Sequence, residues 1–139
     1  MPKIEELKIV LDEFNSIYPR PNMDKLELSQ SFDIRKDFEK FYPGTGFPGV
    51  YIISKENGEI LRIGKSSCNS SLDKRLSTYY KWSKTENIGI ARYAGYSDAF
   101  IINTIILPKN RAFEAPAIEE YLIGRLNPPF NTVGLSDYL

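Results

Sequence analysis

Residues 49–64 read GVYIISKENGEILRIG, and this stretch decides the fold. Strand-like runs flank the dipeptide Asn57-Gly58, which is a strong short-range signal for a β-hairpin turn. Pairing across the turn places Tyr51 opposite Gly64 whether the loop has two residues or a symmetric four. The sequence therefore predicts two antiparallel strands in one fixed register.

This register sorts the side chains of the hairpin onto two faces. We expect an apolar set to face the core: Val50, Ile52, Leu61 and Ile63. Tyr51 and Arg62 lie on the other face as diagonal neighbours, within reach of each other. Gly64 has no side chain, so the phenol of Tyr51 has open space above it.

The rest of the chain shows helical and strand-like periodicity around this hairpin. We expect helices over residues 3–18, 31–41, 71–83 and 111–126, and a central buried strand over residues 100–107. Residues 84–96 define no element. The predicted fold class is α/β of the α+β type, with an N-terminal helical extension over residues 1–48 packed on a domain over residues 49–139.

Composition excludes several classes of chemistry. The 139 residues suffice for one domain with a core, and no histidine is present, which removes Ser-His-Asp and Cys-His systems and histidine metal sites. Cys68 alone cannot form an internal disulfide or a thiolate zinc site. The chain has no membrane-length apolar run and its N-terminus carries acids, so we expect a cytoplasmic protein, a monomer or weak dimer.

Charge is unevenly distributed although Lys and Arg balance Asp and Glu at 18 each. Residues 62–84 contain six basic residues and one acidic residue, with aromatic residues interleaved. This mixture suits contact with nucleic-acid phosphates and bases. The candidate nucleic-acid contacts are Lys65, Lys74, Tyr79 and Lys81. The alternative is a solvated basic helix face.

Helical phase distinguishes one acidic and one basic residue from their neighbours in the sequence. Glu119 falls inside the apolar stripe of the last predicted helix, whereas Glu120 points toward solvent. A carboxylate in that stripe needs a cation, a metal or a hydrogen-bond partner, and a structural ion pair with an arginine is the alternative to a functional role. Arg75 lies at the edge of the buried stripe of its helix, while Lys74 points away.

Four ordered segments resemble the GIY-YIG nuclease family. Gly49-Val50-Tyr51 and, after ten residues, Arg62-Ile63-Gly64 are similar to the hairpin motif, and Arg75 follows on the next helix. Glu119-x-x-Leu122-Ile123 and Asn127-Pro128-Pro129-Phe130-Asn131 are similar to the family's late segment. The resemblance implies a three-stranded antiparallel sheet flanked by helices. It covers residues 49–131 and leaves residues 1–48 outside.

The resemblance also implies an activity, which is metal-dependent hydrolysis of DNA phosphodiesters to 5′-phosphate and 3′-hydroxyl ends. It assigns Tyr51 as general base, Arg75 to the phosphate and Glu119 to a Mg²⁺ or Mn²⁺ ion. Supporting positions are Gly49, Gly64 and Asn131, whose amide would tie the chain after the last helix to the metal-side loop. A simple turn residue is the alternative for Asn131, and RNA is not excluded as substrate.

The sequence departs from the family pattern at Arg62, which occupies the position of the second motif tyrosine. A free tyrosine has a pKa near 10, and a neighbouring cation favours its phenolate. Arg62 is placed to do this for Tyr51, with Lys65 nearby, so we include it among the catalytic residues. Tyr79 stands where some family members carry a histidine.

Two other functions remain open from the sequence. The first is a catalytically degenerate nucleic-acid-binding module that retains the fold, because Arg62 departs from the motif. The second is a protein-interaction domain built on the N-terminal helices, which the retained Tyr51, Arg75 and Glu119 disfavour.

Overall fold

The computed structural model describes residues 1–131 and confirms a mixed α/β fold. Its main antiparallel sheet has four strands in the order β1-β6-β2-β3, one more than the expected three because the two-residue β1 pairs with β6, and a second sheet pairs β4 with β5. The elements in chain order are α1 (Ile4–Ile17), β1 (Phe32–Asp33), β2 (Gly49–Ser54), β3 (Ile60–Ser66), α2 (Leu72–Leu76), β4 (Tyr80–Ser83), β5 (Ile88–Ala91), η1 (Ala94–Tyr96), β6 (Ile101–Ile106), η2 (Lys109–Glu114) and α3 (Ala115–Leu126).

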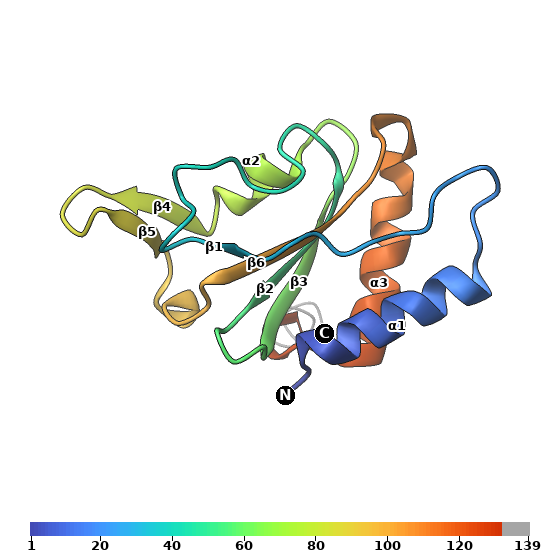
Figure 1. The fold of residues 1–139 in the computed structure, drawn as a ribbon, viewed down its shortest axis with the longest axis horizontal. Coiled ribbons are helices and arrows are strands. Elements are labelled where there is room, and N and C mark those ends of the chain that lie inside the picture. The colour runs from blue at the N-terminus through green and yellow to red at the C-terminus, as the bar shows by residue number, and fades with distance from the viewer. Residues whose placement is uncertain (132–139) are drawn as a thin grey trace, which may run out of the picture.

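The main sheet lies between two layers (Figure 1). On one face, Leu7 of α1 and Leu122 of α3 pack in a core with Ile52 of β2. On the other face, Leu72 of α2 and Tyr80 of β4 belong to a second core. Both faces of the β2–β3 hairpin are therefore covered by apolar side chains, and β3 is left as an edge strand of the sheet.

The hairpin has the register that the sequence predicts. Tyr51 pairs with Gly64 and Ile52 pairs with Ile63. Gly58 occupies the turn with a φ of +92°, a conformation that side-chain-bearing residues rarely adopt. The turn signal and the alternation of apolar residues were thus sufficient to position Tyr51 against Gly64.

A β-bulge changes which face Leu61 occupies. Ile53 pairs with Arg62 and Ser54 pairs with Ile60, so Leu61 is an extra residue between these pairs. Leu61 packs in the core on the α2 side of the sheet. The expectation that Leu61 shares a face with Val50, Ile52 and Ile63 is wrong, because strict alternation fails where two residues oppose one.

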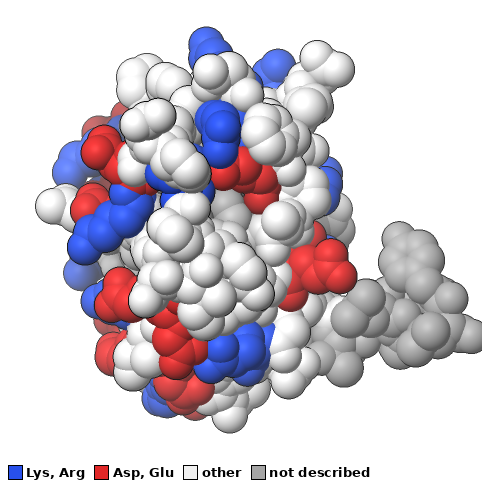
Figure 2. Space-filling view, turned by 90° about the vertical axis from the view of Figure 1, so that its right-hand side faces the viewer, with Lys and Arg blue, Asp and Glu red and all other residues white. Residues whose placement is uncertain are grey.

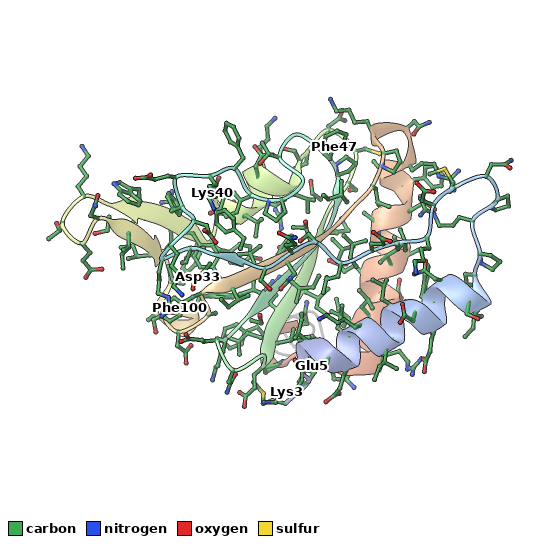
Figure 3. All side chains as sticks on the ribbon, viewed as in Figure 1. Lys3, Glu5, Asp33, Lys40, Phe47 and Phe100 are labelled. Carbon is green, nitrogen blue, oxygen red and sulfur yellow. The ribbon has the colours of Figure 1, made fainter. Side chains whose placement is uncertain are left out.

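The predicted helix over residues 31–41 is absent, and this segment contains β1 and a series of turns. Asp33 accepts a hydrogen bond from the backbone of Arg35, and Asp37 accepts one from the backbone of Asp33. The backbone N–H of Ile34 donates to the carbonyl of Phe100, just before β6. Figure 3 labels Phe100 and the neighbouring Asp33 of β1. Such aspartate bonds compete with helical ones, and pairing with β6 decides the outcome.

The predicted helix over residues 71–83 ends early. Only its first part is helical and forms α2. The chain then forms the β4–β5 hairpin, with β4 in the last part of the predicted helix and β5 among the unassigned residues 84–96. Trp82 of β4 stacks on Phe38 with ring centroids 5.5 Å apart. Aromatic residues favour strands, and tertiary packing overrides the helical spacing that they also satisfy.

The other elements appear where the sequence predicts them. The first helix is α1, the strand at 100–107 is β6 in the interior of the sheet, and the last helix is α3 preceded by η2. Asn127 ends α3 in the left-handed conformation, with φ of 50°. None of the helices within residues 1–131 has the length and apolar character needed to cross a membrane.

The N-terminal segment is tied to the rest of the molecule by apolar packing and by an ion pair. Arg20 makes two hydrogen bonds of 2.7 Å to the carboxylate of Glu114 in η2. Leu7, Val10 and Leu11 are buried in the core that also holds residues of β2 and α3. Residues 1–48 therefore contribute to the core beneath the sheet.

Leu7→Ala should lower the free energy of unfolding of the whole chain by about 2–5 kcal/mol, because it leaves a cavity in a shared core. The matched control is Ile9→Ala on the same helix, where the side chain is 61% exposed and the expected change is within about 0.5 kcal/mol. Urea unfolding measures both. An unchanged main transition for Leu7→Ala would show that residues 1–48 fold as a separate appendage.

Candidate active site

A pocket of about 340 Å³ opens at the edge strand β3. Its lining comes from β2, β3, α2, α3 and the loop between β3 and α2: Tyr51, Arg62, Gly64, Lys65, Ser66, Ser67, Ser70, Arg75 and Glu119. Because β3 is at the edge, side chains from both of its faces reach one pocket. The structure thus brings together the four residues that the sequence analysis assigned to catalysis.

The ring of Tyr51 lies directly against the backbone of Gly64. A Cβ atom at Gly64 would lie 2.1 Å from both Cζ and Oη of Tyr51, far inside van der Waals contact. The space above the glycine is therefore filled by the phenol itself. Tyr51 is fully buried and belongs to the lining of the pocket.

The hydroxyl of Tyr51 is paired with a second phenol. Its oxygen lies 2.8 Å from the hydroxyl oxygen of Tyr79, and the rings pack with centroids 5.6 Å apart. Burial raises the pKa of Tyr79, and the neighbouring Tyr51 adds to this, so the Tyr79 hydroxyl keeps its proton at neutral pH. A protonated Tyr79 can donate a hydrogen bond to the Tyr51 oxygen.

Tyr79, one of the predicted nucleic-acid contacts, is only 8% exposed, and its hydroxyl contacts that of Tyr51. It is not among the residues that line the pocket in the described structure, and its contact with nucleic acid stays a prediction. Lys74 and Lys81 are exposed, and they do not line the pocket as the structure describes it. Of the predicted nucleic-acid contacts, Lys65 alone lines the pocket.

Arg62 lies half-buried beside the phenols. Its guanidinium carbon is 6.0 Å from the ring centroid of Tyr79, and its Nη1 donates a long hydrogen bond of 3.5 Å to the carbonyl of Phe130. Burial opposes its charge, but Tyr79, Tyr96 and Tyr51 more than offset this and hold its pKa above the ordinary value. Its buried Nε has no hydrogen-bond partner within residues 1–131.

Glu119 occupies the position that helical phase predicts. It is half-buried on α3, whereas Glu120 is exposed. Burial raises the pKa of the Glu119 carboxyl, although Lys65, Arg62 and Arg75 act in the opposite direction. Among the residues that the structure describes, none forms an ion pair or side-chain hydrogen bond with Glu119. The structural ion pair that the sequence left open is therefore absent.

The hydroxyl-rich loop after β3 contributes lining residues that the sequence analysis missed. Ser67 and Ser70 line the pocket, and the Oγ atom of Ser66 is buried without a partner in the described part of the chain. A run of serines between a strand and a helix was the available signal. Hydroxyl groups and cations around one carboxylate form a pocket suited to phosphate oxygens.

Asn131 fixes the edge of the pocket. Its side-chain amide donates to the carbonyl of Ile63 at 2.7 Å and accepts from the N–H of Ile63 at 2.8 Å. It therefore ties the chain after α3 to β3 itself, between Arg62 and Gly64, and not to a metal-side loop. Gly49 begins β2 and pairs with Ile106 of β6, and a Cβ atom there would lie 2.0 Å from the carbonyl oxygen of Ile105, so this position has no room for a side chain.

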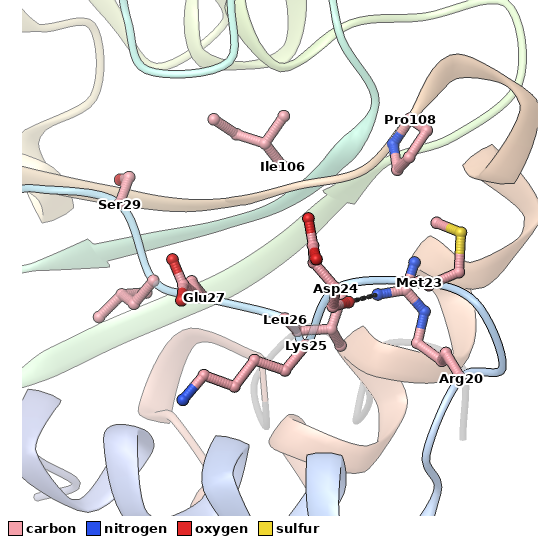
Figure 4. A pocket seen from close by; sticks show the side chains of 10 residues that line it. Arg20, Met23, Asp24, Lys25, Leu26, Glu27, Ser29, Ile106 and Pro108 are labelled. Carbon is pink, nitrogen blue, oxygen red and sulfur yellow. Dashed lines mark hydrogen bonds between the residues drawn. The ribbon is translucent and has the colours of Figure 1, made fainter.

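A second surface pocket contains none of the predicted site residues. It measures about 620 Å³ and lies between residues 20–29 and the end of β6 (Figure 4). Arg20 donates to the carbonyl of Asp24 at its wall and is already paired with Glu114. The neighbouring face, which includes α1 and α3, intermixes acidic and basic side chains (Figure 2). Neither feature has the one-sided charge of the pocket at β3.

Among curated proteins, UvrABC system protein C of Nautilia profundicola is 32% identical to this chain over 87 residues. The similar region is 60% of this chain and 13% of that protein, so the chain spans a small part of its relative's length. No protein-family model matches the chain, and no solved structure matches it. The relationship therefore concerns one segment of a much longer protein.

Gly64→Ala should destabilise the fold by about 1–3 kcal/mol, because the new methyl group must displace the Tyr51 ring from a packed core. The matched control is Gly124→Ala on α3, where a Cβ meets nothing within 4 Å and helix propensity predicts a gain of about 1 kcal/mol. Denaturant unfolding of both variants measures this. If Gly64→Ala were as stable as Gly124→Ala, the Tyr51 ring would be able to move away from the new methyl group at little cost in free energy.

Glu119→Gln should be more stable than the wild type at about pH 7, and the difference should vanish near pH 4. The raised pKa means that the folded state favours the protonated carboxyl. The protonated carboxyl therefore stabilises the fold of the wild type below the unfolded-state pKa of Glu119. This stabilisation is lost as pH rises through the folded-state pKa. Thermal unfolding across pH tests this, and a loss of stability at neutral pH would instead indicate a structural ion pair.

Proposed function

We propose that this protein is a metal-dependent endonuclease that hydrolyses DNA phosphodiester bonds to 5′-phosphate and 3′-hydroxyl ends. The observation that carries the proposal is the convergence of Tyr51, Arg75 and Glu119 on one pocket, although they come from three different elements. The ordered resemblance to the GIY-YIG nucleases supports it. The partial similarity to UvrABC system protein C is in keeping with a nuclease of that type.

The donor set of the pocket fits a magnesium or manganese ion that arrives with a phosphate. Within residues 1–131 no three acidic, cysteine or histidine side chains gather into a complete metal cage. Mg²⁺ does not require one, since it keeps several waters and is commonly bound by one or two carboxylates plus substrate phosphates. Glu119 would hold the ion, which when bound supplies Lewis-acid polarisation of the phosphate.

Arg75 and Lys65 would bind the phosphate group. Both are cations at the pocket wall, and neither forms an ion pair with an acid in the part of the chain that the structure describes. Hydrogen bonds from a guanidinium to phosphate oxygens are charge-assisted and become stronger as negative charge develops on those oxygens. Arg75 therefore both orients the scissile group and stabilises its charge during hydrolysis.

Tyr51 would accept the proton of the attacking water. The chain contains no histidine, and Tyr51 is the phenol that lines the pocket. Its hydroxyl oxygen lies 2.8 Å from that of Tyr79, with either hydroxyl able to donate, and the guanidinium of Arg62 lies beside the two phenols. Arg62 in place of the second motif tyrosine is thus compatible with catalysis, because Tyr79 supplies a second hydroxyl group from the turn between α2 and β4.

One observation favours a second function. Arg62 departs from the family motif, and a chain with a degenerate site would bind nucleic acid without cutting it. Such a protein would still use the cationic wall of the pocket. The two functions differ in one measurable property, which is cleavage that depends on a divalent metal ion.

The purified protein should nick or cut DNA with Mg²⁺ or Mn²⁺ and stop when the metal is chelated. Glu119→Gln and Tyr51→Phe should each reduce the cleavage rate by about 100-fold or more, because each removes a group that acts on the reacting atoms. The matched control is Glu120→Gln, one residue away on the exposed face, which should retain activity. Circular dichroism checks the folding of each variant.

Full activity of Glu119→Gln would remove the metal-binding role from this residue. DNA binding by the wild type without metal-dependent cleavage would establish the binding module instead.

A further inference from the structure

An exposed aromatic side chain lies beside the candidate active site. Phe47 is 42% exposed in the loop that enters β2, and the Nζ atom of Lys109 lies 5.5 Å from its ring centroid. Phe47 lies between the start of α2 and η2, at the upper side of the view in Figure 3. An aromatic ring beside a cation is the combination that stacks with nucleobases near a phosphate backbone.

The loop presents Phe47 on a fixed backbone. The carbonyl of Phe47 accepts a hydrogen bond of 2.9 Å from the N–H of Leu72, the first residue of α2, and its own N–H donates to Gly44 at 2.9 Å. Gly44 and Gly46 have φ of +86° and +85°, in the region that side-chain-bearing residues rarely adopt. The N–H of Gly46 also donates to the carboxylate of Asp73. These bonds fix the backbone that carries the partly exposed ring.

A short path of uncharged residues connects Phe47 with the pocket. Gly49, two residues after Phe47, pairs with Ser66 at the end of β3. The loop from residue 66 to residue 71 reads SSCNSS and carries no acidic side chain. Ser67 and Ser70 in this loop line the pocket, and Leu72 just after it bonds to Phe47. A phosphate chain that passes from the pocket toward Phe47 meets no acid in this loop, and the acid beside the path is Asp73, whose carboxylate accepts a hydrogen bond from the N–H of Gly46.

We propose that Phe47 is a stacking platform for an unpaired base next to the phosphate that enters the pocket, so that the substrate is DNA with a single-stranded or branched segment at the cut. This deepens the proposed nuclease function and rests on it for the position of the phosphate. In a regular duplex each base is covered by its neighbours, so an aromatic ring finds a free base face only where a strand is unpaired. Lys109 adds attraction for the flanking phosphates.

The test is DNA binding in the presence of a chelator, so that no cleavage occurs. The probes are a fluorescently labelled duplex with a single-stranded branch and a fully paired duplex of the same length. The wild type should bind the branched DNA more tightly. Phe47→Ala should weaken that binding about tenfold and leave binding to the paired duplex unchanged, whereas Phe47→Trp should retain the preference.

The chain provides a matched control in Phe113→Ala. Phe113 is 62% exposed and has the guanidinium carbon of Arg111 at 5.1 Å from its ring centroid, but it lines a different pocket beside Phe14 and Tyr18. Removing it should change neither affinity. The comparison separates a located stacking site from the general effect of removing an exposed ring.

Three results would overturn the proposal: Phe47→Ala binds both probes as Phe113→Ala does, Phe47→Ala weakens both probes equally, or the wild type binds neither. Metal-dependent cleavage is measured separately on the same two probes. If the wild type cuts neither DNA yet shows the Phe47-dependent preference, the nuclease function fails and the stacking site stands. If the wild type cuts DNA but shows no Phe47-dependent preference, the stacking site fails and the nuclease function stands.

Discussion

The contact between the Tyr51 ring and the bare backbone of Gly64 determines how the pocket is assembled. It requires β2 and β3 to pair in one register, since a shift by one residue would place a side chain where the phenol lies. With the phenol held there, its hydroxyl meets that of Tyr79, which comes from beyond the end of α2. The site therefore depends first on the lack of a side chain at Gly64.

The electrostatic character of the pocket follows from how few of its charges are neutralised. The whole chain has equal numbers of acidic and basic residues, yet three cations line the pocket and one carboxylate faces them. Elsewhere in the described structure Arg20, Arg35, Arg111 and Arg125 pair with acids, and Arg92 donates to backbone carbonyls. Unpaired cations beside a half-buried carboxylate are costly to stability and useful for binding an anion with a metal ion.

The sequence was sufficient for those features that local rules determine. Asn57-Gly58 sets the hairpin register, and helical phase distinguishes Glu119 from Glu120, so both were predicted before any coordinates. The failures lie where distant partners decide. Residues 31–41 have helical spacing but pair with β6, the aromatic run after Leu76 joins β5, and the bulge at Leu61 breaks the alternation of the strand. The burial of Tyr79 required knowledge of that same packing.

The amide of Asn131 has a consequence beyond the shape of the pocket. An edge strand exposes a row of backbone donors and acceptors, which other polypeptides can use to extend the sheet. By occupying both backbone groups of Ile63 in the middle of β3, Asn131 interrupts that row. Asn131 thus opposes edge-to-edge self-association through β3, while residues of the same strand still line the pocket.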